Sequence, residues 1–357
     1  MLSVTAATTF LPIDALSLTS GEFVTAAAER GHRDRAAALN VYRSIFRDGA
    51  LPMPWATASV GDIVRTQQEG PTVKFAQRID DQLESESVIL PQKSRIGRDR
   101  NTLCVSSQVG CAMGCTFCET AQMGLMRNLT PSQILSQWHA ARFQLHAEIS
   151  NIVFMGMGEP MENLDAVIQA IRVLTDQRGP AIAPSRIAVS TVGRAEGILK
   201  LAAFAQQPGF RRLCLAVSIN APNDEIRSQL MPINRSTNMA ALHEAMMQWP
   251  NGPTRRILIE YVFIPGVNDR LEHADELCEY LKPLYCTVNV IPYNPRRNSP
   301  WPAPDEADVI RFVERISATG QFVTRRRTMG RSLMAACGQL GNEAIRKRKF
   351  VDVRTST

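Results

Sequence analysis

Residues 151–174 have the sequence NIVFMGMGEPMENLDAVIQAIRVL, in which a short apolar run leads through a glycine-rich turn into a segment with helical spacing. The run 151–155 is almost wholly apolar, which is typical of a strand that is buried on both faces of a sheet. Over 164–174, apolar residues recur every three or four positions, as they do in an amphipathic helix. The stretch therefore predicts one strand–turn–helix unit.

The same alternation continues on both sides of this unit. Further strands are expected over 102–107, 186–190, 213–219, 257–263 and 287–291. Further helices are expected over 131–145, 195–204, 239–248, 271–281 and 304–319. Successive units of this kind predict an α/β fold with a parallel sheet covered by helices. The pattern alone fits either a doubly wound sheet or a partial or full βα barrel.

The first 95 residues are organised differently. Helical spacing over 21–30 and 35–47 precedes strand-like alternation over 72–79 and 86–90. This order predicts a small α+β accessory domain over 1–95, followed by the βα units over 96–335 and a basic C-terminal segment over 336–357. The polar, basic stretch 91–100, PQKSRIGRDR, is the expected linker.

Composition limits the class of protein. The 357 residues are 45% hydrophobic and carry a net charge of +6, which argues against disorder and weakly favours a nucleic-acid partner. Basic residues cluster at Arg325, Arg326, Arg327 and Arg331, and at Arg346, Lys347, Arg348 and Lys349. No apolar run approaches the roughly 18 residues of a membrane span, so we expect no membrane segment. The first residues lack a basic start and include Asp14, so we expect a cytoplasmic protein without a secretion signal. Nothing in the sequence calls for more than a monomer.

A cysteine triplet follows the strand predicted over 102–107. Residues 111–118 are CAMGCTFC, which places Cys111, Cys115 and Cys118 in a C-x3-C-x2-C loop. A structural zinc site requires four ligands, and Cys104 is the nearby candidate for the fourth. A four-iron cluster held by three cysteines leaves one iron open, as chelation of S-adenosylmethionine requires. The triplet therefore favours a [4Fe-4S] cluster, with a zinc-stabilised nucleic-acid-binding module as the alternative.

Polar residues follow several of the predicted strands. In a βα barrel, the carboxyl ends of the strands form the active-site face. Taken singly, each of these residues is equally well explained as a loop residue or a helix cap. Taken together, they predict a polar ring suited to the ribose and amino-acid ends of a nucleotide. The residues are Gly158, Glu159, Ser190, Ser218, Asn220 and Asn294.

Several longer segments resemble the RlmN/Cfr-type radical-SAM RNA methyltransferases. They are CVSSQVGCAMGCTFC (104–118), VFMGMGEPMENLDAV (153–167), APNDEIRSQLMPINR (221–235), VIPYNP (290–295) and AACGQLGNE (335–343). The resemblance extends from about residue 71 to the C-terminus. It implies a partial (β/α)6 radical-SAM barrel with a small N-terminal α+β accessory domain that contacts RNA.

The resemblance also implies a role for individual residues. Cys111, Cys115 and Cys118 correspond to the ligands of one [4Fe-4S] cluster, and Cys337 corresponds to a cysteine that is itself methylated. Cys104 corresponds to the cysteine that resolves a covalent intermediate, and Glu86 to a proposed proton acceptor. Residues matching S-adenosylmethionine-binding positions are Gly158, Glu159, Ser190, Ser218, Ile219, Asn220 and Asn294.

In the family's reaction, one S-adenosylmethionine methylates the cysteine that matches Cys337. A second is cleaved reductively to give a radical, so two are used per turnover. The resulting carbon radical adds to an electron-poor ring carbon of adenine. A base such as Glu86 then removes the ring proton, and Cys104 attacks the sulfur of Cys337 to release the product as a disulfide bond forms. A flavodoxin- or ferredoxin-type protein is the expected electron donor.

The expected substrate is an adenosine of 23S rRNA, methylated at C2, with transfer RNA as a further candidate. The alternatives are the same chemistry at C8 and a radical-SAM enzyme acting on a small molecule or peptide. Two positions depart from the family pattern: Asn220 stands where histidine is frequent, and Glu119 stands where a small residue is usual. Because asparagine also donates and accepts hydrogen bonds, we expect cofactor binding to survive.

Overall fold

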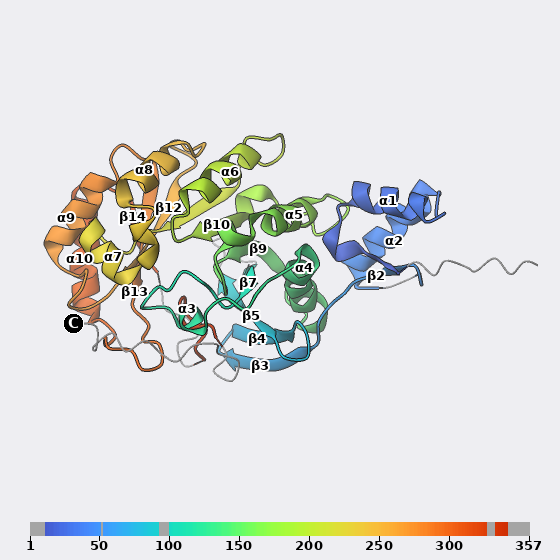
Figure 1. Ribbon diagram of the computed structural model, residues 1–357, viewed down its shortest axis with the longest axis horizontal. Helices are drawn as coiled ribbons and strands as arrows, with labels where there is room; N and C mark the ends of the chain where they lie inside the picture. The colour runs from blue at the N-terminus through green and yellow to red at the C-terminus, as the bar shows by residue number, and fades with distance from the viewer. Residues whose placement is uncertain (1–10, 51–52, 93–99, 327–332, 342–357) are drawn as a thin grey trace, which may run out of the picture.

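The computed structural model describes residues 11–50, 53–92, 100–326 and 333–341, so the linker residues 93–99 and the basic run 346–349 lie outside the described part. Its main feature is a ten-stranded sheet with the order β14-β13-β12-β11-β10-β9-β6-β5-β4-β3 (Figure 1). The parallel strands are β6 (Arg100–Cys104), β9 (Ile149–Phe154), β10 (Ile187–Thr191), β11 (Cys214–Ser218), β12 (Ile257–Phe263), β13 (Cys286–Pro292) and β14 (Val323–Arg325). The six predicted strands are confirmed, and β14 is an addition.

The strand order decides between the two architectures that the sequence allowed. From β9 to β14 the neighbours in the sheet are also neighbours in the chain. A doubly wound sheet reverses its order at a switch point, and these strands do not. The fold is therefore an open, singly wound βα arrangement, as the expected partial barrel requires.

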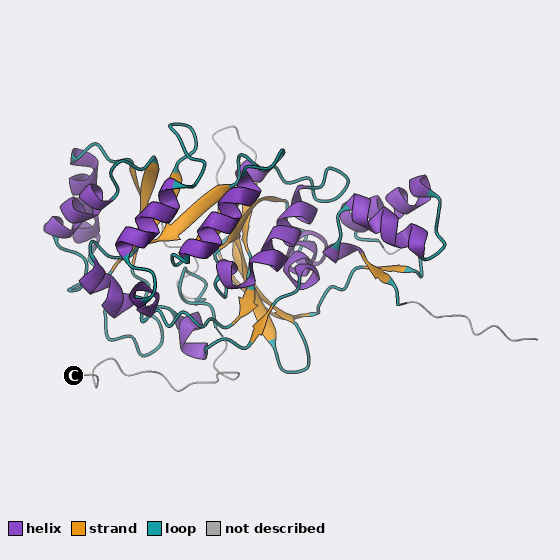
Figure 2. Ribbon diagram, turned by 45° about the horizontal axis from the view of Figure 1, so that its top comes forward, coloured by secondary structure: helices purple, strands orange, loops and turns teal. Residues whose placement is uncertain are grey.

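Helices cover this sheet, as Figure 2 shows. The six predicted in this region are present as α4 (Pro131–His139), α5 (Leu164–Thr175), α6 (Ala195–Ala205), α8 (Met239–Met247), α9 (Leu271–Tyr280) and α10 (Glu306–Ala318). A capping box of Thr130 and Gln133 starts α4, and a π-helical turn, η2 (Ala140–Gln144), continues it. Helix α5 buries Val167, Ile171 and Leu174 along one stripe. None of the described helices is long and apolar enough to cross a membrane.

Short elements complete this part of the chain. They are β7 (Gln108–Val109), α3 (Glu119–Met123), β8 (Arg127–Asn128), η3 (Pro160–Asn163), η4 (Pro184–Arg186), α7 (Asp224–Leu230) and η5 (Pro232–Arg235). The first three surround the cysteine triplet, because the loop that carries it lies between β7 and α3.

The N-terminal region contains the two predicted helices, α1 (Ser20–Glu29) and α2 (Arg35–Asp48). Short elements flank them: β1 (Ile13–Asp14), η1 (Ala15–Ser17) and β2 (Ala56–Thr57). Strands β3 (Ile63–Glu69), β4 (Thr72–Arg78) and β5 (Glu84–Gln92) follow, and β5 pairs antiparallel with barrel strand β6. Strand β3 was not expected, since its residues IVRTQQE are mostly polar. These strands thus extend the barrel sheet at its β6 edge.

Candidate active site

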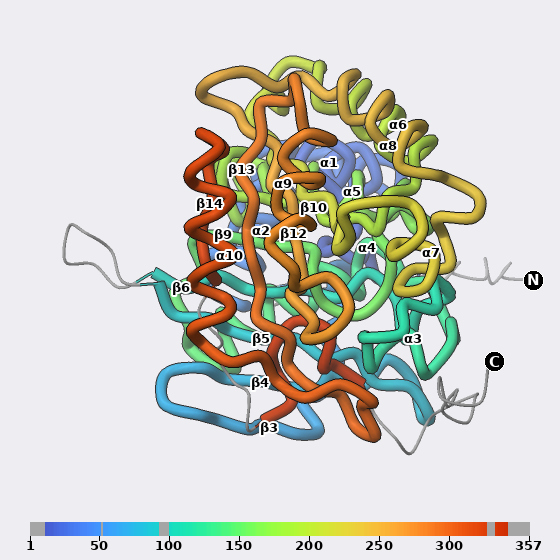
Figure 3. The backbone as a smooth tube through the Cα atoms, turned by 90° about the vertical axis from the view of Figure 1, so that its left-hand side faces the viewer, coloured from blue at the N-terminus to red at the C-terminus, as the bar shows by residue number. Residues whose placement is uncertain are grey.

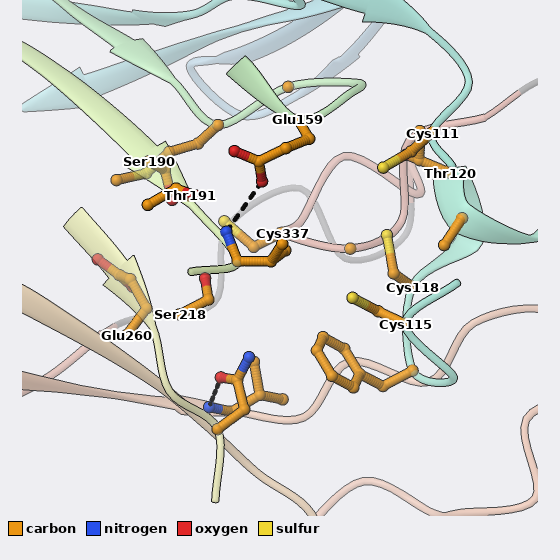
Figure 4. A pocket seen from close by; sticks show the side chains of 18 of the residues that line it. Cys111, Cys115, Cys118, Thr120, Glu159, Ser190, Thr191, Ser218, Glu260 and Cys337 are labelled. Carbon is orange, nitrogen blue, oxygen red and sulfur yellow. Dashed lines mark hydrogen bonds between the residues drawn. The ribbon is translucent and has the colours of Figure 1, made fainter. Parts of the chain in front are cut away.

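A cavity at the carboxyl ends of the barrel strands brings most of the predicted residues together (Figure 4). The predicted residues that line it are Cys111, Cys115, Cys118, Gly158, Glu159, Ser190, Ser218, Asn220 and Cys337. They come from the cysteine loop, from the ends of β9, β10 and β11, and from the C-terminal segment. We call this space the cofactor cavity.

The backbone of the cysteine loop is fixed from both ends. The amide of Cys111 donates to the carbonyl of Gly124, and the amide of Thr116 donates to that of Leu230. Gly110 has a φ of 75°, and a Cβ there would lie 1.9 Å from the Gly124 oxygen, so glycine is required. The turn thereby presents the three thiols to the cofactor cavity from one side, as Figure 4 shows.

The three thiols suit a cluster better than a single ion. Burial raises the pKa of Cys111, Cys115 and Cys118, so thiolates here require a positively charged partner. Within the described residues, no three histidine, cysteine or carboxylate side chains converge as ligands of one metal ion would. A four-iron cluster does not need that convergence, because its cysteine ligands bind different irons.

Glu159 lines the cofactor cavity just after β9. Its Oε1 accepts from the amide of Met161 at 3.0 Å, and its Oε2 accepts from the amide of Val192 at 2.9 Å. Burial raises its pKa to about 7, although these hydrogen bonds oppose the shift. The neighbouring Gly158 has a φ of 101° and lies against Gln108, so a side chain there would clash. The carboxylate is the acceptor that an ammonium group would need.

The turn after β11 combines a cavity residue with a core residue. Asn220 has a φ of 56°, a conformation that asparagine tolerates, and its Oδ1 accepts from the amide of Val262 at 2.9 Å. Ile219 is buried in the core and does not line the cavity. The fully buried Arg227 donates to the carbonyls of Val192, Ser218 and Ile219, and so fixes the ends of β10 and β11.

A second cavity adjoins the first, and we call it the thiol cavity. Cys104, Asn294 and Cys337 line it together with Arg326 and apolar residues. Asn294 therefore lies beside the two cysteines and outside the cofactor cavity. Burial and the neighbouring Cys337 raise the pKa of Cys104 to about 12, and Arg326 lowers it. Cys104 and Cys337 are both free thiols.

Glu86 lines neither cavity and is instead buried in an ion-pair cluster. Its Oε2 lies 3.0 Å from Nζ of Lys74, and its Oε1 lies 3.5 Å from Arg65. The amide of Gly341, four residues after Cys337, donates to Oε2 at 2.8 Å. The carboxylate thus touches the segment that carries Cys337.

Three of these residues were missed by the sequence analysis. Glu260 is buried in the cofactor cavity, where Asn289 donates to it at 2.9 Å. A lone carboxylate in the apolar strand ILIEYVF was the available signal. Arg326 borders both cavities but was concealed in a run of arginines, and Lys74 carried no sequence signal.

Glu119, one of the two departures, lies beneath the C-terminal segment. Its carboxylate is buried 3.6 Å from Arg297, and its amide donates to the carbonyl of Gly338 at 2.6 Å. The departure therefore adds an ion pair with the half-buried Arg297 directly after the cysteine loop, while the bond to Gly338 is made by the backbone.

Comparison with known proteins shows which family the chain is similar to. Residues 105–281 match the family model described as the Radical SAM superfamily. The chain is 39% identical to "Probable dual-specificity RNA methyltransferase RlmN 1" of Protochlamydia amoebophila, with 95% of this chain and 97% of that protein covered. It is 40% identical to "Dual-specificity RNA methyltransferase RlmN" of Campylobacter jejuni, over 78% of this chain and 80% of that protein. The crystal structure of a radical SAM methyltransferase from Sphaerobacter thermophilus superposes with a TM-score of 0.81 and 35% identity, covering 92% of this chain and 99% of that one.

Proposed function

Since the chain belongs to the RlmN-type family of radical-SAM RNA methyltransferases, we propose that it methylates carbon 2 of an adenine in 23S rRNA and in transfer RNA. The relatives named as dual-specificity RNA methyltransferases support two kinds of RNA substrate. One observation carries the proposed mechanism: Cys337 borders the cofactor cavity and the thiol cavity at once. A single sulfur there can receive a methyl group on one side and meet Cys104 on the other.

Cys111, Cys115 and Cys118 hold the [4Fe-4S] cluster in this proposal. A cluster bound by these thiolates would supply the electron for cleavage of S-adenosylmethionine. Glu159 accepts from the cofactor's ammonium group, while Ser190, Ser218 and Asn220 bind its polar edge. Asn294 lies in the thiol cavity, so it meets the cofactor only where the two cavities join. Two S-adenosylmethionine molecules are consumed per turnover, one as methyl donor and one as radical source.

Cys104 releases the product. Its thiolate attacks the sulfur of Cys337, so that an S–S bond forms as the bond between that sulfur and the new methyl carbon breaks. That carbon takes up a proton to complete the methyl group, and the unpaired electron left by the radical addition would return to the oxidised cluster. Because burial disfavours this thiolate, Arg326 in the same cavity is the cation that stabilises it. External thiols then reduce the disulfide. Glu86, which lies outside both cavities but touches the Cys337 segment, accepts the ring proton beside Lys74.

The remaining assignments concern the surroundings of the reaction. Residues 1–95 and the basic clusters contact RNA phosphates, which position the substrate without selecting bases. The protein acts in the cytoplasm as a monomer, with a flavodoxin- or ferredoxin-type electron donor.

The test uses reconstituted protein, a reductant and methyl-labelled S-adenosylmethionine, with 23S rRNA and transfer RNA as substrates. Mass spectrometry of the digested RNA is expected to find label in 2-methyladenosine. Label in 8-methyladenosine would assign C8 instead of C2 as the methylated carbon. Cleavage of the cofactor without labelled RNA would overturn the proposal that these RNAs are the substrates. Cys104→Ala is expected to accumulate a protein–RNA adduct through Cys337, and Cys337→Ala is expected to form none.

A further inference from the structure

Residues 333–341, which we call the Cys337 segment, are held by hydrogen bonds to buried side chains on both sides of Cys337. Three residues before Cys337, the carbonyl of Met334 accepts from Nζ of Lys74 at 3.2 Å. Four residues after it, the amide of Gly341 donates to Oε2 of Glu86 at 2.8 Å. Figure 3 shows this C-terminal segment running close to β4 and β5, the strands that carry Lys74 and Glu86. The two side chains therefore bracket Cys337.

Lys74 and Glu86, the two side chains that hold the segment, also form an ion pair with each other. Nζ of Lys74 lies 3.0 Å from Oε2 of Glu86, and the two side chains are only 6% and 3% exposed. The same oxygen thus holds both Lys74 and the Gly341 amide. Arg65 approaches the other oxygen, Oε1, at 3.5 Å, and also pairs with Glu84 at 3.0 Å. Within the described residues, Arg65 bonds to these two carboxylates and makes no hydrogen bond to the Cys337 segment.

The backbone of the segment is strained at Met334, the residue whose carbonyl accepts the hydrogen bond from Lys74. Met334 has a φ of 52°, a left-handed conformation that is costly for a side chain of this size. Such a conformation persists only where its surroundings enforce it, and the hydrogen bond from Lys74 is part of that enforcement. Loss of the bond would let the segment relax.

We propose that the Lys74–Glu86 ion pair holds the Cys337 segment in place until Glu86 is protonated, and we call this arrangement the latch. The proposal rests on the function proposed above, in which Glu86 accepts the ring proton. While Glu86 is a carboxylate, the ion pair holds Cys337 at the border of the cofactor cavity. When the proton arrives on Oε2, the carboxyl group becomes neutral and its attraction for Lys74 is lost. The segment is then released, and the sulfur of Cys337 turns toward Cys104.

In this scheme Lys74 is a positioning residue, because it acts through the segment and not on the substrate. The charged groups that face Glu86 are Lys74 from β4 and Arg65 from β3, with Glu84 of β5 beyond Arg65. No oxidant or reductant enters the step, since a proton leaves the adenine carbon and is bound by the Glu86 oxygen.

The latch is tested by hydrogen–deuterium exchange of the peptide that contains residues 333–341, in the full chain purified anaerobically. Lys74→Met is expected to speed exchange about tenfold, which corresponds to the loss of one net hydrogen bond. Glu86→Gln mimics the protonated carboxyl group and is expected to give a similar increase. Arg65→Met is the matched control, because it removes a cation from the same carboxylate without touching the segment. Its exchange is expected to equal that of the parent.

Two results would overturn the latch: unchanged exchange in Lys74→Met or Glu86→Gln, or an equal increase in Arg65→Met. If Lys74→Met does not fold, the double variant Lys74→Met/Glu86→Gln leaves no unpaired charge and must show the faster exchange. This readout needs neither substrate nor turnover. A failure of the proposed reaction, seen as a missing Cys104→Ala adduct, is therefore distinguishable from a failure of the latch.

Discussion

Oε2 of Glu260 lies 3.7 Å from Nη1 of Arg326, and both side chains border the cofactor cavity that Cys337 also lines. The arginine extends from there into the thiol cavity. Asn289 anchors the carboxylate at 2.9 Å, so the guanidinium is held from one side and faces the two cysteines on the other. The buried pair thus places a positive charge where thiolates have to form.

Replacing Arg326 by glutamine is expected to raise the pKa of Cys104. A rise of one unit lowers the thiolate fraction, and hence the iodoacetamide labelling rate at Cys104, about tenfold at a fixed pH. The labelling rate is followed by peptide mass spectrometry between about pH 7 and pH 10. Arg326→Lys keeps the charge and is expected to retain most of the rate.

Arg325→Gln is the control for that experiment, because Arg325 makes its ion pair with the exposed Glu306. It removes the same charge from the adjacent position and should leave Cys104 labelling unchanged. Equal slowing in both variants would assign the effect to general electrostatics or to altered access.

Binding of S-adenosylmethionine is expected to weaken as the pH falls below 7. Burial raises the pKa of Glu159 to about 7, so below this value the carboxyl group is increasingly protonated and loses its charge for the ammonium group. With one controlling group, the affinity falls about tenfold per pH unit in that range. Calorimetric titration from pH 6 to pH 8 checks the slope, which Glu159→Gln should abolish. A slope that persists in that variant would place the titration elsewhere.

Arg227→Met is expected to destabilise the fold by about 3 kcal/mol, because several buried carbonyls lose their donor. Chemical denaturation measures the change. The carbonyls of Val192, Ser218 and Ile219 belong to the turns that line or support the cofactor cavity. Arg235→Met, on the exposed end of the neighbouring η5, is the matched control and should change the stability little.

Glu119→Ala is expected to make the reduction potential of the proposed cluster less negative. Burial raises the pKa of Cys118, and the Glu119 carboxylate beside it adds to the rise. A negative charge there also disfavours the added electron. Arg297→Gln, which removes the partner 3.6 Å away, should shift the potential in the opposite direction. A redox titration followed by electron paramagnetic resonance measures both, and shifts of equal sign would contradict the electrostatic explanation.

The sequence predicted the barrel well because its strands are continuous apolar runs between amphipathic helices. It missed β3 and β14, whose stability depends on edge pairing to β4 and β13 and not on their own composition. The cysteine triplet was predicted from its spacing, and the strand-end residues of the cofactor cavity were predicted because the topology gathers strand ends at one face. Arg326 and Lys74 act through contacts between distant segments, which no local pattern records.

The pairing of β5 with β6 has a consequence for attempts to dissect the molecule. Cys104 stands in register with Val88 of β5, which in turn stands opposite Lys74 of β4. A barrel cut to begin at residue 100 would keep its cysteine triplet, yet it would present β6 as a bare edge prone to pairing with other chains. It would also lack Glu86 and Lys74. The N-terminal strands are therefore not a detachable module: a minimal catalyst, or a chimera with another barrel, has to carry them along.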